Sequence, residues 1–175
     1  MHKAFTRWCV KRHWAIWPDI RSLMTSSGEP WTLQENLPLK NLQVGAGRPD
    51  GLTLIPWQGG KPLVWDFTIV RLLVQSYVDR AVTGVGAVAE LAAERKAEKY
   101  HSLSSDHIFQ PIAMENFCAF SSSSLEFLGE LGRRLGSLSG EEREACFLFQ
   151  RLSIAIQRFN SVLLHNGFTD DIPDL

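Results

Sequence analysis

Two aspartates, Asp50 and Asp66, mark the stretch of this sequence best suited to chemistry. Asp50 precedes one apolar run, and Asp66 lies late in a second run, residues 62–70. The two runs are joined through Gly59-Gly60, a pair typical of a β-hairpin turn. Because the start of one antiparallel strand lies beside the end of the other, the hairpin is expected to bring both carboxylates together. Paired carboxylates are the ligands that a hard cation such as Mg²⁺ (or Mn²⁺) requires.

Each aspartate also has an ordinary structural interpretation. Asp50 lies in Pro-Asp-Gly, which is a common turn sequence. Asp66 interrupts the apolar run Leu-Val-Trp-Asp-Phe-Thr-Ile-Val, where an ionised side chain is costly unless it is paired or bound to a cation. The residues alone leave the structural and the functional interpretation evenly balanced.

A second set of candidate residues, Lys96, Lys99 and Tyr100, ends a segment of strong helix formers at 87–100. In the functional interpretation, one lysine projects over the hairpin beside the aspartates. There it would orient a water molecule and stabilise charge that develops on a phosphoryl group. In the structural interpretation, the lysines belong to an exposed face of Glu/Lys pairs, and the helix taken alone favours this second view.

Further candidates are weaker. Glu35 lies on the strand expected before the hairpin, and Glu115 lies on the strand expected after the helix at 87–100. Each could be an extra metal ligand or an ordinary strand-edge carboxylate. The histidines have no metal-binding spacing, which disfavours a small-molecule metallohydrolase. The basic surface best suited to a phosphate backbone is formed by Arg133, Arg134, Arg151 and Arg158. In the structural interpretation, these arginines simply lie on the hydrated faces of two helices.

Composition sets broad limits on these hypotheses. The chain has 175 residues, 45% of them hydrophobic, with a net charge of −1, so any basic surface must be local. Three well-separated cysteines, Cys9, Cys118 and Cys146, indicate free thiols and a reducing, intracellular location. No apolar run approaches the roughly 20 residues that span a bilayer, so no membrane partner is expected. The basic, aromatic N-terminal residues lack the apolar core of a secretory signal.

The elements that must position the candidate residues follow from local patterns. We expect a helix at 19–27, a strand at 31–37, the hairpin, the helix at 87–100 and a strand at 108–120, whose Pro111 indicates an edge position or a bulge. Two helices should follow, at 125–135 and at 141 to about 164. Ser121–Ser124 can cap the first of them, and Ser139 with Glu142 forms a capping-box pattern for the second.

This order predicts an α/β (α+β) fold with a mixed sheet of about four strands flanked by helices, two of them extra C-terminal helices. We expect an N-terminal arm at 1–12, a single domain at 13–165 and a frayed acidic tail at 166–175.

Three phrases together resemble a known superfamily. They are Arg-Pro-Asp at 48–50, Trp-Asp-Phe-Thr at 65–68 and Lys-x-x-Lys-Tyr at 96–100. Their order and strand context resemble the restriction-endonuclease-like PD-(D/E)XK nucleases, and more narrowly the restriction-like endonuclease segment of non-LTR retrotransposons. The resemblance covers residues 13–157. In that group the lysine that usually follows the second acid is missing, and a helix lysine is thought to replace it; here Thr68 stands at that position.

The resemblance implies a metal-dependent endonuclease domain that cleaves DNA phosphodiester bonds, in the nucleus if it acts on DNA. Asp50 and Asp66 would hold Mg²⁺ (or Mn²⁺), with Glu35 as a further acid. Lys96 would be the catalytic lysine, with Lys99 as the alternative. Tyr100 would support the helix or contact the phosphate backbone. Arg48 would bind the nucleic acid.

The implied partners are DNA and, in a larger polyprotein, a reverse transcriptase segment. The alternative is a catalytically inactive nuclease-fold module that binds nucleic acid or a protein partner.

Overall fold

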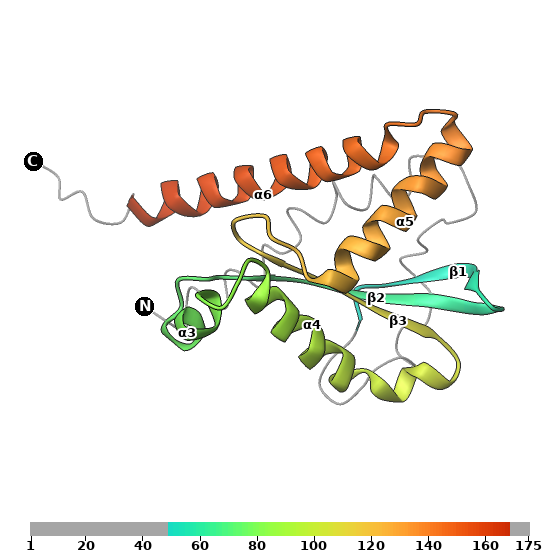
Figure 1. Cartoon of the computed structure of the whole chain (residues 1–175), viewed down its shortest axis with the longest axis horizontal. Helices are drawn as coiled ribbons and strands as arrows, with labels where there is room; N and C mark the ends of the chain where they lie inside the picture. Colours follow the sequence, from blue (N-terminus) through green and yellow to red (C-terminus); the bar gives the residue numbers. More distant parts are fainter. Residues whose placement is uncertain (1–48, 169–175) are drawn as a thin grey trace, which may run out of the picture.

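The structure, a computed structural model, describes residues 49–168 and shows a mixed α+β fold. Its sheet has three strands in the order β1 (Gly51–Gln58), β2 (Lys61–Val70) and β3 (Ile108–Glu115). β1 and β2 are antiparallel, whereas β2 and β3 are parallel (Figure 1). The expected mixed sheet is therefore confirmed. The helix expected at 19–27 and the strand expected at 31–37 lie outside the described residues.

The hairpin between β1 and β2 turns where the sequence predicts. Gly59 and Gly60 both have positive φ angles, 57° and 77°. Two consecutive residues in the left-handed region match the right-handed twist of the flanking strands, and glycine adopts this conformation at no steric cost. Two register shifts follow within β1, between Gln58 and Leu52, so the turn and these irregularities together bring the residues before β1 to the middle of β2.

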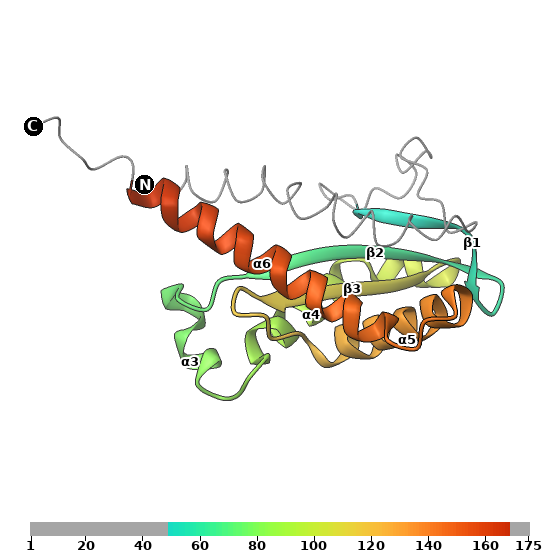
Figure 2. The same ribbon diagram turned by 90° about the horizontal axis from the view of Figure 1, so that it is seen from above.

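A helical crossover joins the parallel strands β2 and β3, as parallel pairing requires. The chain first passes through η3 (Gln75–Tyr77) and α3 (Val78–Ala81), and then forms α4 (Ala87–Lys99) and η4 (His101–Ser105). Figure 1 shows α4 on one side of the sheet, with α5 (Ser122–Ser139) and α6 (Glu144–Phe168) on the other side. A view from above shows how far α6 continues beyond the sheet (Figure 2).

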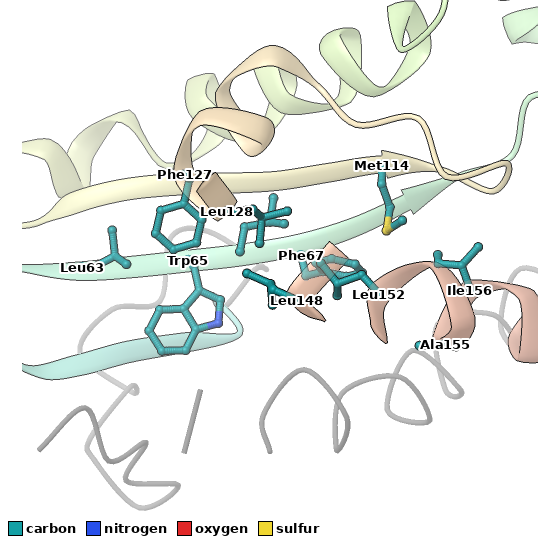
Figure 3. Packing of buried hydrophobic residues seen from close by; sticks show 11 residues of the cluster. Leu63, Trp65, Phe67, Met114, Phe127, Leu128, Leu148, Leu152, Ala155 and Ile156 are labelled. Atoms are coloured by element: carbon teal, nitrogen blue, oxygen red, sulfur yellow. The ribbon is translucent and has the colours of Figure 1, made fainter. Parts of the chain in front are cut away.

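The larger core lies between the sheet and the layer formed by α5 and α6. Alternate residues of β2 point into it, with Trp65 at its centre, and α6 contributes Leu148 and Leu152 (Figure 3). Where α4 itself meets the sheet, the packing is made by smaller groups. Ala89 and Ala93 of α4 lie against Ala113 of β3. This difference in residue size lets α4 approach the sheet closely.

Serines at the start of α5 cover the outer edge of β3. The backbone N–H of Ser121 donates to the Ala113 carbonyl at 3.1 Å, and the N–H of Ala113 donates to Oγ of Ser124 at 2.9 Å. Oγ of Ser121 also accepts the N–H of Ser124 as the N-cap of α5. The predicted cap is confirmed, and the edge position indicated by Pro111 holds within the three described strands.

Three expected boundaries in the C-terminal part are wrong. β3 ends at Glu115 instead of continuing to residue 120, because the chain turns through Cys118, whose φ is 71°. The helix expected at 125–135 extends over Ser122–Ser139 and ends at Gly140, whose φ is 75°. The capping box of Ser139 and Glu142 does not form, because Ser139 is the last residue of α5 and α6 begins at Glu144.

The remaining general expectations concern cysteines and membranes. In the described part of the chain, Cys118 and Cys146 are free thiols. None of the helices within residues 49–168 is both long enough and apolar enough to cross a bilayer.

Candidate active site

The hairpin brings Asp50 directly beside Asp66. Gly51 is paired with Trp65, and the N–H of Asp50 donates to the Trp65 carbonyl at 3.0 Å. Oδ2 of Asp50 accepts the N–H of Phe67 at 2.7 Å. The Asp50 carboxylate is therefore anchored to the peptide that follows Asp66. It lies where β1 begins, while β2 continues past it to Val70, paired with β3.

Asp66 is buried on the α4 side of β2, where only 3% of its surface is exposed. Its Oδ2 forms an ion pair with Nζ of Lys96 on α4. Within residues 49–168, this oxygen receives no hydrogen bond of normal geometry. A buried carboxylate of this kind depends on a cation, since leaving it uncompensated is costly.

The alanine face of α4 explains why Lys96 is the lysine that reaches Asp66. Ala89, Ala93 and Lys96 follow one another at spacings of four and three residues, so they share one side of the helix. Ala89 and Ala93 pack against Ala113 on the neighbouring strand β3. This contact orients Lys96 toward the sheet, one turn further along the helix.

Glu115 anchors the other end of the same helix. Its Oε1 accepts hydrogen bonds from the N–H groups of Val88 at 3.1 Å and Ala89 at 3.4 Å. These N–H groups lie in the first turn of α4, where a helix provides no acceptor of its own. Glu115 pairs with Val70, four residues beyond Asp66, which places it about 13 Å along the strand. Its interpretation as a metal ligand is therefore wrong: Glu115 is a buried helix cap. The sequence offered no local signal, because the capped donors lie more than 25 residues away.

Tyr100, the residue after α4, completes the cluster. Only 1% of its surface is exposed. Burial raises the pKa of its hydroxyl above 10.0, the nearby charge of Asp66 raises it further, the Lys96 ammonium partly offsets these effects, and Asp50 adds to the increase. The hydroxyl therefore lies within the electrostatic reach of all three charged groups, and it stays neutral at physiological pH.

Lys99 contacts Tyr100 instead of the carboxylates. Its Nζ donates to the Tyr100 hydroxyl at 3.2 Å and lies 4.7 Å from the centre of the ring. The structure thus separates the two lysines that the sequence left as alternatives. Lys96 meets Asp66, and Lys99 covers the tyrosine.

The donor set suits a hard cation. The pairing of Gly51 with Trp65 sets Asp50 next to Asp66 on the neighbouring strand, and one oxygen of Asp66 lacks a normal hydrogen bond from the described residues. In the described part of the chain, no group of three or more His, Cys, Asp or Glu side chains is placed to hold a metal. Two carboxylates fit Mg²⁺, which commonly takes one or two protein carboxylates and keeps several waters. Glu35 and Arg48 lie outside the described residues.

The four arginines proposed for phosphate contact do not join this cluster. All four lie on α5 or α6, across the sheet from α4 (Figure 1). Arg134 stacks on Trp57, with 3.8 Å between its guanidinium and the ring, and also pairs with Glu130. Arg133 pairs with the same glutamate, whereas Arg151 and Arg158 are exposed. Arg134 therefore has a structural role, which is to fasten the hairpin to α5.

Comparison of the chain with protein-family models, with curated proteins and with solved structures finds no match, so the cluster of Asp50, Asp66, Lys96 and Tyr100 is interpreted from its own geometry.

Proposed function

We propose that this chain is a metal-dependent DNA endonuclease domain of the restriction-endonuclease-like type, derived from a retroelement. The observation that carries the proposal is the ion pair between Lys96 of α4 and the buried Asp66 of β2. The resemblance implies a nuclease whose catalytic lysine has moved from the strand to the following helix. Thr68 occupies the usual lysine position, and Lys96 reaches the same carboxylate from α4.

Each residue then has a distinct role. Asp50 and Asp66 would hold a Mg²⁺ or Mn²⁺ ion, which when bound lowers the pKa of a water molecule and neutralises charge on the phosphate. Lys96 orients the attacking water and stabilises the negative charge that develops on the phosphoryl oxygens. The neutral Tyr100 hydroxyl accepts a hydrogen bond from Lys99 and lies within electrostatic reach of both carboxylates. DNA as the substrate rests on the resemblance of the three phrases at 48–50, 65–68 and 96–100.

The alternative is a nuclease-fold module that binds without cleaving. Two observations favour it: Lys96 already neutralises Asp66, and Arg151 and Arg158 are exposed on the opposite side of the sheet. In this case the protein would bind nucleic acid or a protein partner, and the carboxylates would have a structural role only.

Nicking of supercoiled plasmid DNA in the presence of Mg²⁺ or Mn²⁺ tests the proposal. Asp66→Asn keeps the shape of the side chain but removes its charge, and we expect it to lower the nicking rate by about 10²–10³-fold, the scale for losing one electrostatic contact to a transition state. Asp79→Asn, on the exposed helix α3, is the matched control and should nick at the wild-type rate.

Equal nicking by wild type and Asp66→Asn would remove Asp66 from the mechanism. Wild-type protein that binds DNA in a gel-shift assay but does not nick it with either metal would favour the binding module.

A further inference from the structure

We propose that Lys96 occupies the cation position of this site, so that its ammonium group and a divalent metal compete for Oδ2 of Asp66. The inference rests on the metal site of the proposed function and adds a property to it. In the metal-free protein the lysine would be the resident cation, and metal binding would release it.

The two partners of the ion pair differ in their freedom to move. Asp66 lies in the central strand β2 and is only 3% exposed, so its carboxylate is fixed. The side chain of Lys96 is 28% exposed at the surface of α4. A lysine on a flexible four-carbon stem can withdraw its ammonium into solvent while its methylene groups stay packed. Any exchange of cations at Asp66 therefore moves Lys96 and leaves the carboxylate in place.

The charges of the cluster favour a divalent ion over the lysine. A divalent ion at Oδ2 of Asp66 would carry twice the charge of the Lys96 ammonium, so its attraction to that carboxylate would be stronger at the same distance. Tyr100 adds no charge, because its pKa is raised. Without Lys96, a metal at Oδ2 of Asp66 would have no ammonium group to displace.

Oδ2 of Asp66 is the atom for which the two cations would compete. It is buried, it has no hydrogen bond of normal geometry from the described residues, and it meets the Lys96 ammonium. Metal binding at this oxygen would therefore free Lys96 at the moment when a substrate phosphate needs a positive charge. Metal binding and the release of the catalytic lysine from its ion pair would then occur together.

Binding of Mn²⁺ alone to the whole chain, measured by electron paramagnetic resonance in the absence of DNA, tests the competition. Lys96→Met should bind Mn²⁺ at least about tenfold more tightly than wild type, because a unit charge a few ångströms from the metal is removed. Its thermal unfolding temperature should be lower than that of wild type in chelator, and Mn²⁺ should raise it by more than it raises the wild-type value. Lys99→Met, the matched control on the same helix, should keep the wild-type Mn²⁺ affinity, since Lys99 contacts Tyr100.

Lys96→Arg, which keeps the charge, should not tighten Mn²⁺ binding, and Lys96→Gln provides a second neutral variant if the methionine variant folds poorly. Equal or weaker Mn²⁺ binding by the neutral variants would overturn the competition, while plasmid nicking by wild type would still support the proposed function. Tighter binding by the neutral variants together with an inactive wild type would support the competition and reject the nuclease. If neither wild type nor the neutral variants bind Mn²⁺, both proposals fail.

Discussion

The two faces of the sheet carry different kinds of buried side chains. On the side of α5 and α6, the buried side chains are large: Trp65 and Phe67 of β2 meet Leu148 and Leu152 of α6 (Figure 3). On the side of α4, the helix contacts the sheet through Ala89 and two other alanines, and the same face also holds the buried Asp66 and Tyr100. The same strand therefore contributes apolar bulk to one face and charge to the other.

This contrast separates the residues that stabilise the fold from the residues of the candidate site. Burial of large apolar side chains is the main favourable term in folding, so the α5/α6 face carries most of the stability. The close approach of α4, which small residues allow, brings a lysine to a strand carboxylate. A polar cluster on the α4 face costs stability that the opposite face can offset. Three measurements test this division between the two faces.

The largest effect is expected from Leu152→Ala, which removes a side chain that is 2% exposed in the larger core. We expect a loss of about 2–5 kcal/mol in the free energy of unfolding, measured by urea titration. Ile154→Ala is the control two residues away; that side chain is 59% exposed, so the change should stay within about 0.5 kcal/mol. A Leu152→Ala protein that is folded but nicks DNA as slowly as Asp66→Asn would contradict the separation of the two faces.

A smaller effect is expected where α5 and α6 cross. A Cβ atom added at Gly132 would lie 2.6 Å from the Cα of Ala145, so the two helix backbones would have to move apart. Gly132→Ala should therefore destabilise the protein by about 1–3 kcal/mol in chemical unfolding. Gly129→Ala lies on the same helix with nothing within 4 Å of the new atom, and should stabilise the protein by about 0.4–1 kcal/mol. The division would fail if both variants shifted stability in the same direction.

The smallest effect concerns the ionisation of Tyr100 on the α4 face. The chain has two tyrosines, and Tyr77 is not buried, so ultraviolet absorbance of Tyr77→Phe and Tyr100→Phe assigns each titration. Tyr100 should ionise above pH 10.0, because burial and the two carboxylates raise its pKa. The unfolded chain loses this proton first, so this contribution to stability is present below pH 10.0 and is lost as the pH rises further. Identical titration of the two tyrosines would mean that Tyr100 does not sense Asp66.

Local signals in the sequence predicted the parts of the fold that depend on near neighbours. Gly59-Gly60 predicted the hairpin turn, and the antiparallel pairing of one strand's start with the other's end predicted that Asp50 lies near Asp66. Ser121 was predicted as part of a helix cap, and it is one. The cap joins residues that are close in sequence, and a two-residue turn joins the hairpin strands, whose final register also depends on two irregularities in β1 that the sequence pattern did not predict.

Signals that depend on distant neighbours could not be resolved from the sequence. Lys96 and Lys99 are three residues apart, and only the rotation of α4, set by the contact of its alanines with Ala113, decides which one faces Asp66. Glu115 caps a helix that begins 28 residues earlier, at Ala87, and no spacing rule connects the two. The side of the sheet that α5 and α6 cover likewise decides that Arg151 and Arg158 lie away from the carboxylates (Figure 1).

The serines along the outer edge of β3 have a consequence for how copies of this protein meet one another. An uncovered strand edge offers a row of N–H and C=O groups to any passing chain, and such edges seed aggregation and strand exchange. Here the amide and the carbonyl of Ala113 are both already bonded, to Ser124 and Ser121. At Ala113, this margin of the sheet therefore offers no free backbone group to another strand unless the start of α5 first unwinds.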